Sequence, residues 1–142
     1  MAKLTPYLYF NGNCREAMNF YHDCLGGELK MQTVAESGAA DKMPKEAGPM
    51  IMHSTLDKGN LSLMGSDMMD SKPDQGNTVS LTLVCDSEAE IKSYFEKLSQ
   101  GGKVTSPLKT EFWGGTFGQL VDKYGFAWMM ALATSLRPSR LS

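Results

Sequence analysis

A histidine stands in the middle of an expected strand, where titratable side chains are uncommon. In the stretch IMHSTL, His53 alternates with Met52 and Ser54, so if those two residues face a helix, His53 faces the open side of the sheet. Because a histidine changes charge near neutral pH, it can act there as a general base or as a hydrogen-bond donor to a bound anion. The alternative is a structural histidine that a neighbouring tyrosine or a backbone carbonyl satisfies.

Aromatic side chains accompany this histidine at two places in the chain. Tyr7 and Tyr9 share one face of an expected strand, where they line a pocket and bond a polar ligand or, alternatively, form part of a dimer surface. Trp113 and Phe117 precede and enter another strand, where they form an aromatic wall or ordinary plugs of the core. Trp128 is expected to pack against a helix as a core residue.

The cysteines and glycine pairs disfavour several other chemistries. Three cysteines without a C-x-x-C pair favour a reducing cytoplasm and argue against disulfides and a thiolate metal site. Cys14 falls at a helix start, where we expect a lowered thiol pKa, but no His or Asp stands beside it to make it a nucleophile. Cys24 falls on a buried stripe and is expected to be inert. Neither Gly26-Gly27 nor Gly114-Gly115 has the pattern of a phosphate-binding loop.

Charge and hydropathy exclude two classes of partner. The net charge is −2 with acids and bases mixed, which indicates no general attraction to nucleic acid or to an anionic membrane. No apolar run has the length of a transmembrane helix and we expect no signal peptide, so the protein is predicted to be cytoplasmic. Eleven methionines is a high number for 142 residues, and this side chain suits an adaptable apolar pocket.

The elements that position these residues occur twice. The segment FYHDCLGGEL begins at Phe20 and YFEKLSQGGKV begins at Tyr94, and each reads as the end of an amphipathic helix closed by a glycine pair. A short apolar run precedes each helix, at residues 6–10 and 79–84. Strand, helix, Gly-Gly and strand thus recur at an offset of about half the chain, which predicts a duplicated module whose copies share one core.

The signals for turns and caps divide each module into further elements. Asn13 is expected to cap the first helix, Gly26 to end it in the left-handed conformation, and a Ser87–Glu90 capping box to begin the second. Residues 34–49 form a long loop, either a binding lid or a surface insertion. The predicted strands are 4–10, 28–33, 49–56 and 61–64 in the first module, and 78–84, 103–108, 112–121 and 126–132 in the second.

Two consecutive βαβββ modules, with FYHDCLGG closing the first helix and DKYGFAW before the last strand, resemble the vicinal oxygen chelate superfamily, which includes glyoxalase I, bleomycin-resistance proteins and extradiol dioxygenases. The finer resemblance is to its PhnB-like branch and spans residues 4–132. It implies an α+β fold in which each module forms a glyoxalase-like open half-barrel with its helix outside, and a ligand lies between the half-barrels. The residues that carry it are Pro6, Tyr7, Leu8, Tyr9, Phe10, Asn11, Gly12, Glu16, Ala17, Phe20, Tyr21, His53, Leu63, Met64, Gly101, Gly102, Trp113, Gly114, Phe117, Gly118, Asp122, Gly125 and Trp128.

The resemblance also implies where a divalent metal would bind in the superfamily's enzymes. Its ligands are His, Glu or Gln side chains on the first and the last strand of each module. In this chain those positions fall at about Thr5, Met64, Thr78 or Ser80, and Met129. Hydroxyls and thioethers do not suit a hard dication, so we predict neither a metal site nor another cofactor. The chain also lacks the Gly-rich loop after a first parallel strand that would indicate S-adenosylmethionine binding.

These observations favour one domain over residues 1–142, with module one at about 1–67, a linker at about 66–77, module two at about 78–133 and a frayed tail at 134–142. We expect a homodimer that binds a small molecule in its cavity without metal. Two alternatives stay open, namely a metal-dependent or His53-assisted lyase, isomerase or dioxygenase, and a protein that sequesters a drug or toxin. The expected ligand-binding residues are Tyr7, Tyr9, His53, Met64, Trp113, Phe117 and Met129.

Overall fold

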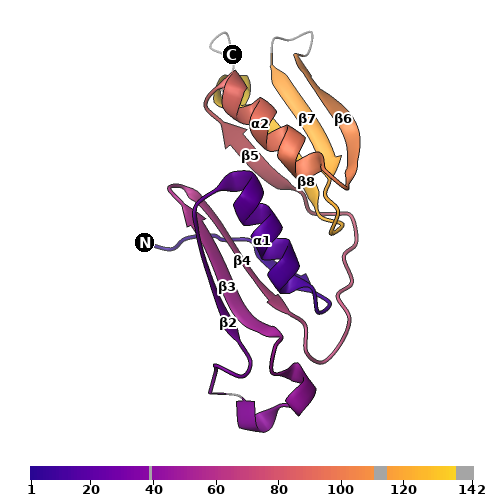
Figure 1. Cartoon of the computed structure of the whole chain (residues 1–142). Coiled ribbons are helices and arrows are strands. Elements are labelled where there is room, and N and C mark those ends of the chain that lie inside the picture. Colours follow the sequence, from indigo (N-terminus) through magenta and orange to yellow (C-terminus); the bar gives the residue numbers. More distant parts are fainter. Residues whose placement is uncertain (39, 111–114, 137–142) are drawn as a thin grey trace. The chain divides into compact units, whose positions relative to one another are not determined.

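The structure, a computed structural model, describes residues 1–38, 40–110 and 115–136, and forms two compact units (Figure 1). Met1–Asp74 is the first unit and Gln75–Ser142 the second. Each contains one four-stranded sheet with an α-helix against one of its faces. That the two units share one core and form a single domain stays a prediction.

The first unit has the element order β-α-β-β-β. Its sheet has the strand order β1-β4-β3-β2, with β1 parallel to β4 and the other neighbours antiparallel. Helix α1 packs on the face that buries alternate residues of β1, Leu8 and Phe10. The bounds are β1 (Tyr7–Phe10), α1 (Cys14–Leu25), β2 (Glu28–Thr33), β3 (Ile51–Lys58) and β4 (Leu61–Asp67).

The second unit repeats this order and this pairing. Its sheet has the order β5-β8-β7-β6, with β5 parallel to β8 and the rest antiparallel. Both parallel pairs bring a methionine of the last strand opposite the first strand, Tyr7 with Met64 and Thr82 with Met129. The bounds are β5 (Leu81–Cys85), α2 (Glu88–Ser99), β6 (Lys103–Thr110), β7 (Thr116–Val121) and β8 (Ala127–Leu132). The prediction of an α+β fold with two βαβββ modules is therefore confirmed.

Helix α1 buries the predicted stripe with two differences. Ala17, Tyr21 and Leu25 are buried as expected, and so is Cys24, whereas Phe20 is partly exposed. Cys14 and Met18 are fully buried although the prediction left them out. The helix therefore presents a wider apolar face to the sheet than the aromatic residues alone indicated.

Asn13 and Gly26 occupy the predicted cap positions of α1, but neither caps the helix in the predicted way. The side chain of Asn13 makes no capping hydrogen bond. The buried carboxylate of Asp67 at the end of β4 instead accepts the backbone N–H of Cys14 at 2.9 Å. Gly26 ends the helix with φ +77° and ψ −161°, a conformation that needs glycine but lies outside the left-handed helical region.

The predicted capping box of α2 is present. The Ser87 hydroxyl oxygen accepts the backbone N–H of Glu90 at 3.1 Å. The carboxylate of Glu90 turns back to the N–H of Asp86, one residue earlier than in the usual box. At the opposite end of the second sheet from this box, the Asp122 carboxylate accepts the indole N–H of Trp128 at 2.8 Å, and Trp128 is buried as expected.

Residues 34–49 contain more regular structure than predicted. They include the short 3₁₀ helices η1 (Ala40–Lys42) and η2 (Lys45–Ala47). The N–H of Val34 donates to the carbonyl of Met50, so the loop begins on a continuation of the β2–β3 pairing. The carboxylate of Glu36 accepts both the N–H and the hydroxyl of Thr33, which lowers the pKa of Glu36. Neither the lid nor the surface-insertion interpretation is tested by these contacts.

Several predicted boundaries move. Strand β1 begins at Tyr7 rather than residue 4, because Pro6 offers its carbonyl to Met64 but has no N–H. Strand β4 continues to Asp67, which the prediction had placed in the linker, and β5 begins at Leu81 rather than residue 78. A 3₁₀ helix, η3 (Ala133–Leu136), stands where a frayed tail was expected to begin, and residues 137–142 lie outside the described residues. Neither α-helix in the described ranges has the length and apolarity that a membrane crossing requires.

Candidate functional site

The face of the first sheet that points away from α1 brings together four of the predicted binding residues. Tyr7 and Tyr9 are 36% and 49% exposed, while their neighbours in β1 are buried under the helix. Met64 of β4 is the register partner of Tyr7 and therefore shares its face. His53 is two residues from Thr55, the register partner of Met64 on β3, so His53 also points to this open face. The structure confirms the predicted alternation in β1 and from His53 onward in β3, whereas a register shift at the start of β3 leaves Ile51 buried and Met52 partly exposed.

Tyr7 and His53 are in direct contact. The Tyr7 hydroxyl lies 3.3 Å from Nδ1 of His53, and the two rings stack with a centroid distance of 5.9 Å. Because β4 lies between β1 and β3 in the sheet, the Tyr7 side chain spans the strand that carries Met64. The ring of Tyr9 lies 5.0 Å from that of Tyr7, so the three rings form one aromatic cluster on the sheet.

The surroundings of His53 fit the structural interpretation at one ring nitrogen and the functional interpretation at the other. A neighbouring tyrosine satisfies Nδ1, as in the structural interpretation. Within the part of the chain that the structure describes, no hydrogen bond reaches Nε2 of His53, and the side chain is only partly buried. An imidazole with one ring nitrogen hydrogen-bonded and the other open suits either ligand binding or proton transfer.

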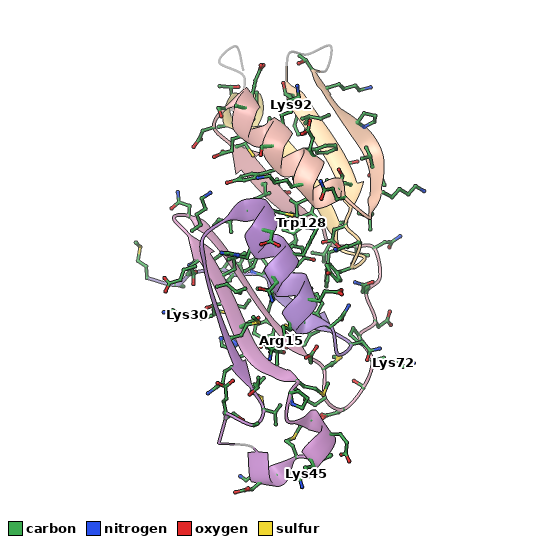
Figure 2. All side chains as sticks on the ribbon, in the orientation of Figure 1. Arg15, Lys30, Lys45, Lys72, Lys92 and Trp128 are labelled. Carbon is green, nitrogen blue, oxygen red and sulfur yellow. The ribbon has the colours of Figure 1, made fainter. Side chains whose placement is uncertain are left out.

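Charged side chains on this face lie on β2 and at the far end of β3. Lys30 of β2 is the register partner of Thr55 and extends into solvent (Figure 2). It forms an exposed ion pair with Glu28 at 3.6 Å, and Asp57 of β3 lies 4.0 Å from the ammonium of Lys3. Gln32, opposite His53 on β2, is uncharged. Each carboxylate on the face thus has a cation beside it.

Two of the predicted binding residues, Phe117 and Met129, lie on the open face of the second sheet and are partly exposed. That they line a binding site stays a prediction. The amide of Gln119 donates to the sulfur of Met129 at 3.8 Å. Trp113 lies outside the described residues. That the faces of the two sheets line one cavity stays a prediction.

The shared register gives a residue-by-residue comparison of the two open faces. Thr82 corresponds to Tyr7, because each is the partner of the methionine on the last strand. On the third strand of each unit, Phe117 corresponds to His53, two residues before the partner of that methionine. The hydrogen-bonding pair of the first sheet therefore has a hydroxyl and a phenyl ring as its counterpart in the second.

The positions that the resemblance assigned to a metal carry hydroxyls and thioethers in both units. Thr5 precedes β1, while Thr78 and Ser80 precede β5, and the Ser80 hydroxyl reaches the carbonyl of Ala127 at 3.5 Å. Their hydroxyls and the thioethers of Met64 and Met129 are poor ligands for a hard dication. Across residues 1–38, 40–110 and 115–136, no group of three His, Cys, Asp or Glu side chains is placed to hold a metal ion.

The prediction of a lowered thiol pKa at Cys14 is wrong. Burial raises the pKa of the Cys14 thiol to about 12, more than its contact with the Ser54 hydroxyl lowers it. Burial also raises the pKa of Cys85, to about 11. Both thiols are therefore protonated at neutral pH and unsuited to nucleophilic chemistry. Cys24 is buried, as expected.

Sequence reasoning missed two buried carboxylates and a groove. Asp67 is the last residue of β4 and Asp122 directly follows β7, and alternation alone gives no reason for burying an acid there. A groove of about 340 Å³ lies between α2 and the β6–β7 end of the second sheet, lined in part by Ile91, Phe95 and Leu108. None of the predicted binding residues that the structure describes lines this groove, and the two carboxylates form hydrogen bonds within the fold. Neither feature is therefore part of the face that carries Tyr7 and His53.

Comparison with known proteins gives consistent relatives over almost the whole chain. The sequence profile of the Glyoxalase/Bleomycin resistance protein/Dioxygenase superfamily matches residues 3–130. Protein YjdN of Escherichia coli (strain K12) is 33% identical in an alignment 141 positions long, gaps included, that covers 89% of this chain and 92% of YjdN.

Two solved structures are similar in both sequence and fold. Protein PA1353 from Pseudomonas aeruginosa is 39% identical with a TM-score of 0.82, over 93% of this chain and 98% of that one. A PhnB protein from Bacillus cereus, named as a putative 3-demethylubiquinone-9 3-methyltransferase, is 30% identical with a TM-score of 0.75, over 93% and 100% of the two chains.

Proposed function

The chain belongs to the Glyoxalase/Bleomycin resistance protein/Dioxygenase superfamily, and we propose that this PhnB- and YjdN-like member binds a small molecule without a metal. The observation that carries the proposal is the aromatic cluster of Tyr7, Tyr9 and His53 beside Met64 on the open face of the first sheet. Aromatic and thioether surface with a few polar atoms is typical of sites for apolar or aromatic ligands with one or two polar groups.

Two further observations support binding rather than metal catalysis. The superfamily's metal positions hold hydroxyls and thioethers, which do not suit the cations of its enzymes. A methyltransferase, as the Bacillus cereus relative is named, requires a cofactor site for which this sequence has no Gly-rich signature. The proposal therefore rests on the chain's own side chains and not on the names of its relatives.

A His53-assisted enzyme is the second candidate, because the bond from Tyr7 orients the imidazole as a general base would need to be oriented. Sequestration of a cationic drug is less well supported. The carboxylates on the face, Glu28 and Asp57, each lie beside a lysine, so they offer no unpaired negative charge to a cation.

A ligand screen with a blocking variant tests the binding proposal. Ligand-observed NMR with a library of aromatic acids, ketones, phenols and amines gives hits, whose affinities are then measured for Met64→Lys. This substitution places a charged side chain in the middle of the cluster, and we expect it to weaken every genuine hit. The matched control is Asn19→Lys, which makes the same charge change on an exposed position of α1. Hits that Met64→Lys leaves unchanged would show that the open face of the first sheet is not the site.

Metal analysis separates the two candidate functions. Elemental analysis of the protein purified without chelators is expected to show no stoichiometric zinc, nickel, iron or manganese. A stoichiometric metal that chelation removes, together with a catalytic activity, would reject the binding-protein proposal. Turnover of a bound ligand that persists after chelation and is lost in His53→Gln would favour the His53-assisted enzyme instead.

A further inference from the structure

We propose that His53 recognises an oxygen atom of the ligand by donating a hydrogen bond from Nε2–H, in a tautomer that Tyr7 maintains; this assignment rests on the proposed function and specifies the ligand class. The ligand carries a hydrogen-bond-accepting oxygen at its polar end, and a carboxylate or another anionic oxygen binds better than a neutral one. A ligand with an ammonium group at that end is rejected.

The first step is the assignment of the tautomer. A neutral imidazole has one N–H donor and one lone-pair acceptor, and the hydrogen bond at one nitrogen decides the role of the other. The Tyr7 hydroxyl lies 3.3 Å from Nδ1 of His53. A phenol is a good O–H donor and a poor acceptor, because its oxygen lone pair is delocalised into the ring, so it donates to Nδ1. The proton of the imidazole is then on Nε2, which faces away from Tyr7.

Second, the charges around the Tyr7–His53 pair bear on which ligand group can bind there. The titratable and charged groups on this face are Tyr7, Tyr9, Lys3, Glu28, Lys30 and Asp57. Glu28 and Asp57 are register partners of each other, two residues along their strands from Lys30 and Thr55 and further still from His53. Lysines lie 3.6 Å from Glu28 and 4.0 Å from Asp57. Within the described chain, therefore, no carboxylate contacts the Tyr7–His53 pair, and a cationic ligand group would find no counter-charge there.

The third step is the contrast between the two copies of the module. The positions of Tyr7 and His53 in the first sheet correspond to Thr82 and Phe117 in the second. A fold built from such a module needs neither the hydroxyl nor the imidazole, because the second copy forms the same sheet without them. The pair is thus a property of this one face, as expected for a ligand anchor rather than a structural contact.

The tautomer can be tested without a ligand. Two-bond ¹H–¹⁵N correlation spectra of the uniformly labelled protein at pH 8 report which imidazole nitrogen carries the proton. The chain has two histidines, so the variant His22→Gln, changed on α1, assigns the His53 signals. We expect the Nε2–H tautomer of His53 to be populated above its share in a free neutral histidine, and that share to fall toward the free-histidine value in Tyr7→Phe. A predominant Nδ1–H form in the unsubstituted protein would overturn the assignment.

The ligand class can be tested with three probes of one shape: 2-naphthoate, 2-acetylnaphthalene and 2-naphthylmethylammonium. We expect the affinity order naphthoate, ketone, ammonium, with about tenfold or more between the first and the last. The change His53→Phe, which installs the residue of the second sheet, is expected to weaken naphthoate about 10- to 100-fold, the range for loss of a hydrogen bond to a charged group. His53→Gln keeps an N–H donor and should recover part of that loss, while His22→Gln should change nothing.

The binding results distinguish a failure of the His53 assignment from a failure of the proposed small-molecule binding. Equal or tighter binding of the ammonium probe, or naphthoate binding that His53→Phe leaves unchanged, overturns the inference while small-molecule binding stands. If neither these probes nor the screening library binds the protein, the proposed function fails and the assignment of His53 fails with it.

Discussion

The carboxylate of Asp67 joins two parts of the first unit, and its removal should destabilise that unit. The side chain is 4% exposed at the last position of β4. One carboxylate oxygen accepts the N–H of Cys14 at the start of α1, and the other accepts the N–H of Ile51 at the start of β3, both at 2.9 Å. Without Asp67 both donors lose their partner in a region that excludes water, since Cys14 and Ile51 are each buried.

The two bonds set the size of the expected effect. A hydrogen bond to a charged group contributes about 1.5–3 kcal/mol, so Asp67→Ala should lower the free energy of unfolding by about 3–6 kcal/mol. Asp67→Asn keeps one acceptor oxygen and turns an NH₂ group toward the other donor, so about 1.5–3 kcal/mol should be lost. The control Asp70→Ala removes an exposed carboxylate from the same unit and should stay within about 0.5 kcal/mol of the unsubstituted protein.

Urea unfolding followed by far-UV circular dichroism measures these differences, and hydrogen exchange places them in the structure. Both tryptophans, Trp113 and Trp128, belong to the second unit, so fluorescence follows that unit separately. Exchange of the first amides of α1 should accelerate most, because their anchor is lost. If Asp67→Ala unfolds at the same urea concentration as Asp70→Ala, the carboxylate is not an anchor and the account of how α1 begins is wrong.

Two further predictions follow from packing and from thiol burial. Gly118→Ala should cost about 1–3 kcal/mol, because a Cβ there would lie 2.6 Å from the Phe95 ring, whereas Gly38→Ala meets nothing within 4 Å and should be nearly neutral; thermal melts of both variants check this. The folded-state pKa values of about 12 for Cys14 and about 11 for Cys85 exceed the ordinary 9.0. The two buried thiols therefore contribute fully to stability below pH 9, and their contribution declines as the pH rises toward the folded-state pKa values. The destabilisation caused by Cys14→Ala should therefore shrink between pH 8 and pH 11 by up to ~1.4 kcal/mol per pH unit, and urea titrations that show a constant difference would contradict the assigned shift.

The parts of the fold that depend on neighbours in the chain were predictable. The amphipathic stripes, the Ser87–Glu90 box and the glycines after each helix all act over a few residues, and each appears in the structure. The capping bond of α1 was mispredicted because its acceptor, Asp67, is 53 residues away from Cys14 in sequence. Asn13 holds the N-cap position that the local rule gave it, but the distant carboxylate supplies the acceptor.

In the candidate site, too, the features set by neighbouring residues were predictable and those set by distant residues were not. Alternation in β1 and β3 correctly placed Tyr7 and His53 on faces away from the helix. Their contact joins residues 46 positions apart and depends on β4 lying between their strands, which no pattern within either strand specifies. The raised pKa of Cys14 was also out of reach, because a helix start predicts a lowered value and only the packing reveals the burial that dominates.

The duplication explains why this fold was easier to infer than its function. Glycines persist after both helices because backbone lies against them: a Cβ on Gly27 would approach the carbonyl of Asp57, and one on Gly102 would approach that of Val121. Helix-facing positions must fill a core, so both copies keep most of them apolar, with Ser54 an exception. Open-face positions carry no such constraint, and there His53 in one copy corresponds to a phenyl ring in the other. Repetition therefore identifies what the fold requires, and the chemistry particular to this protein must lie where the two copies differ.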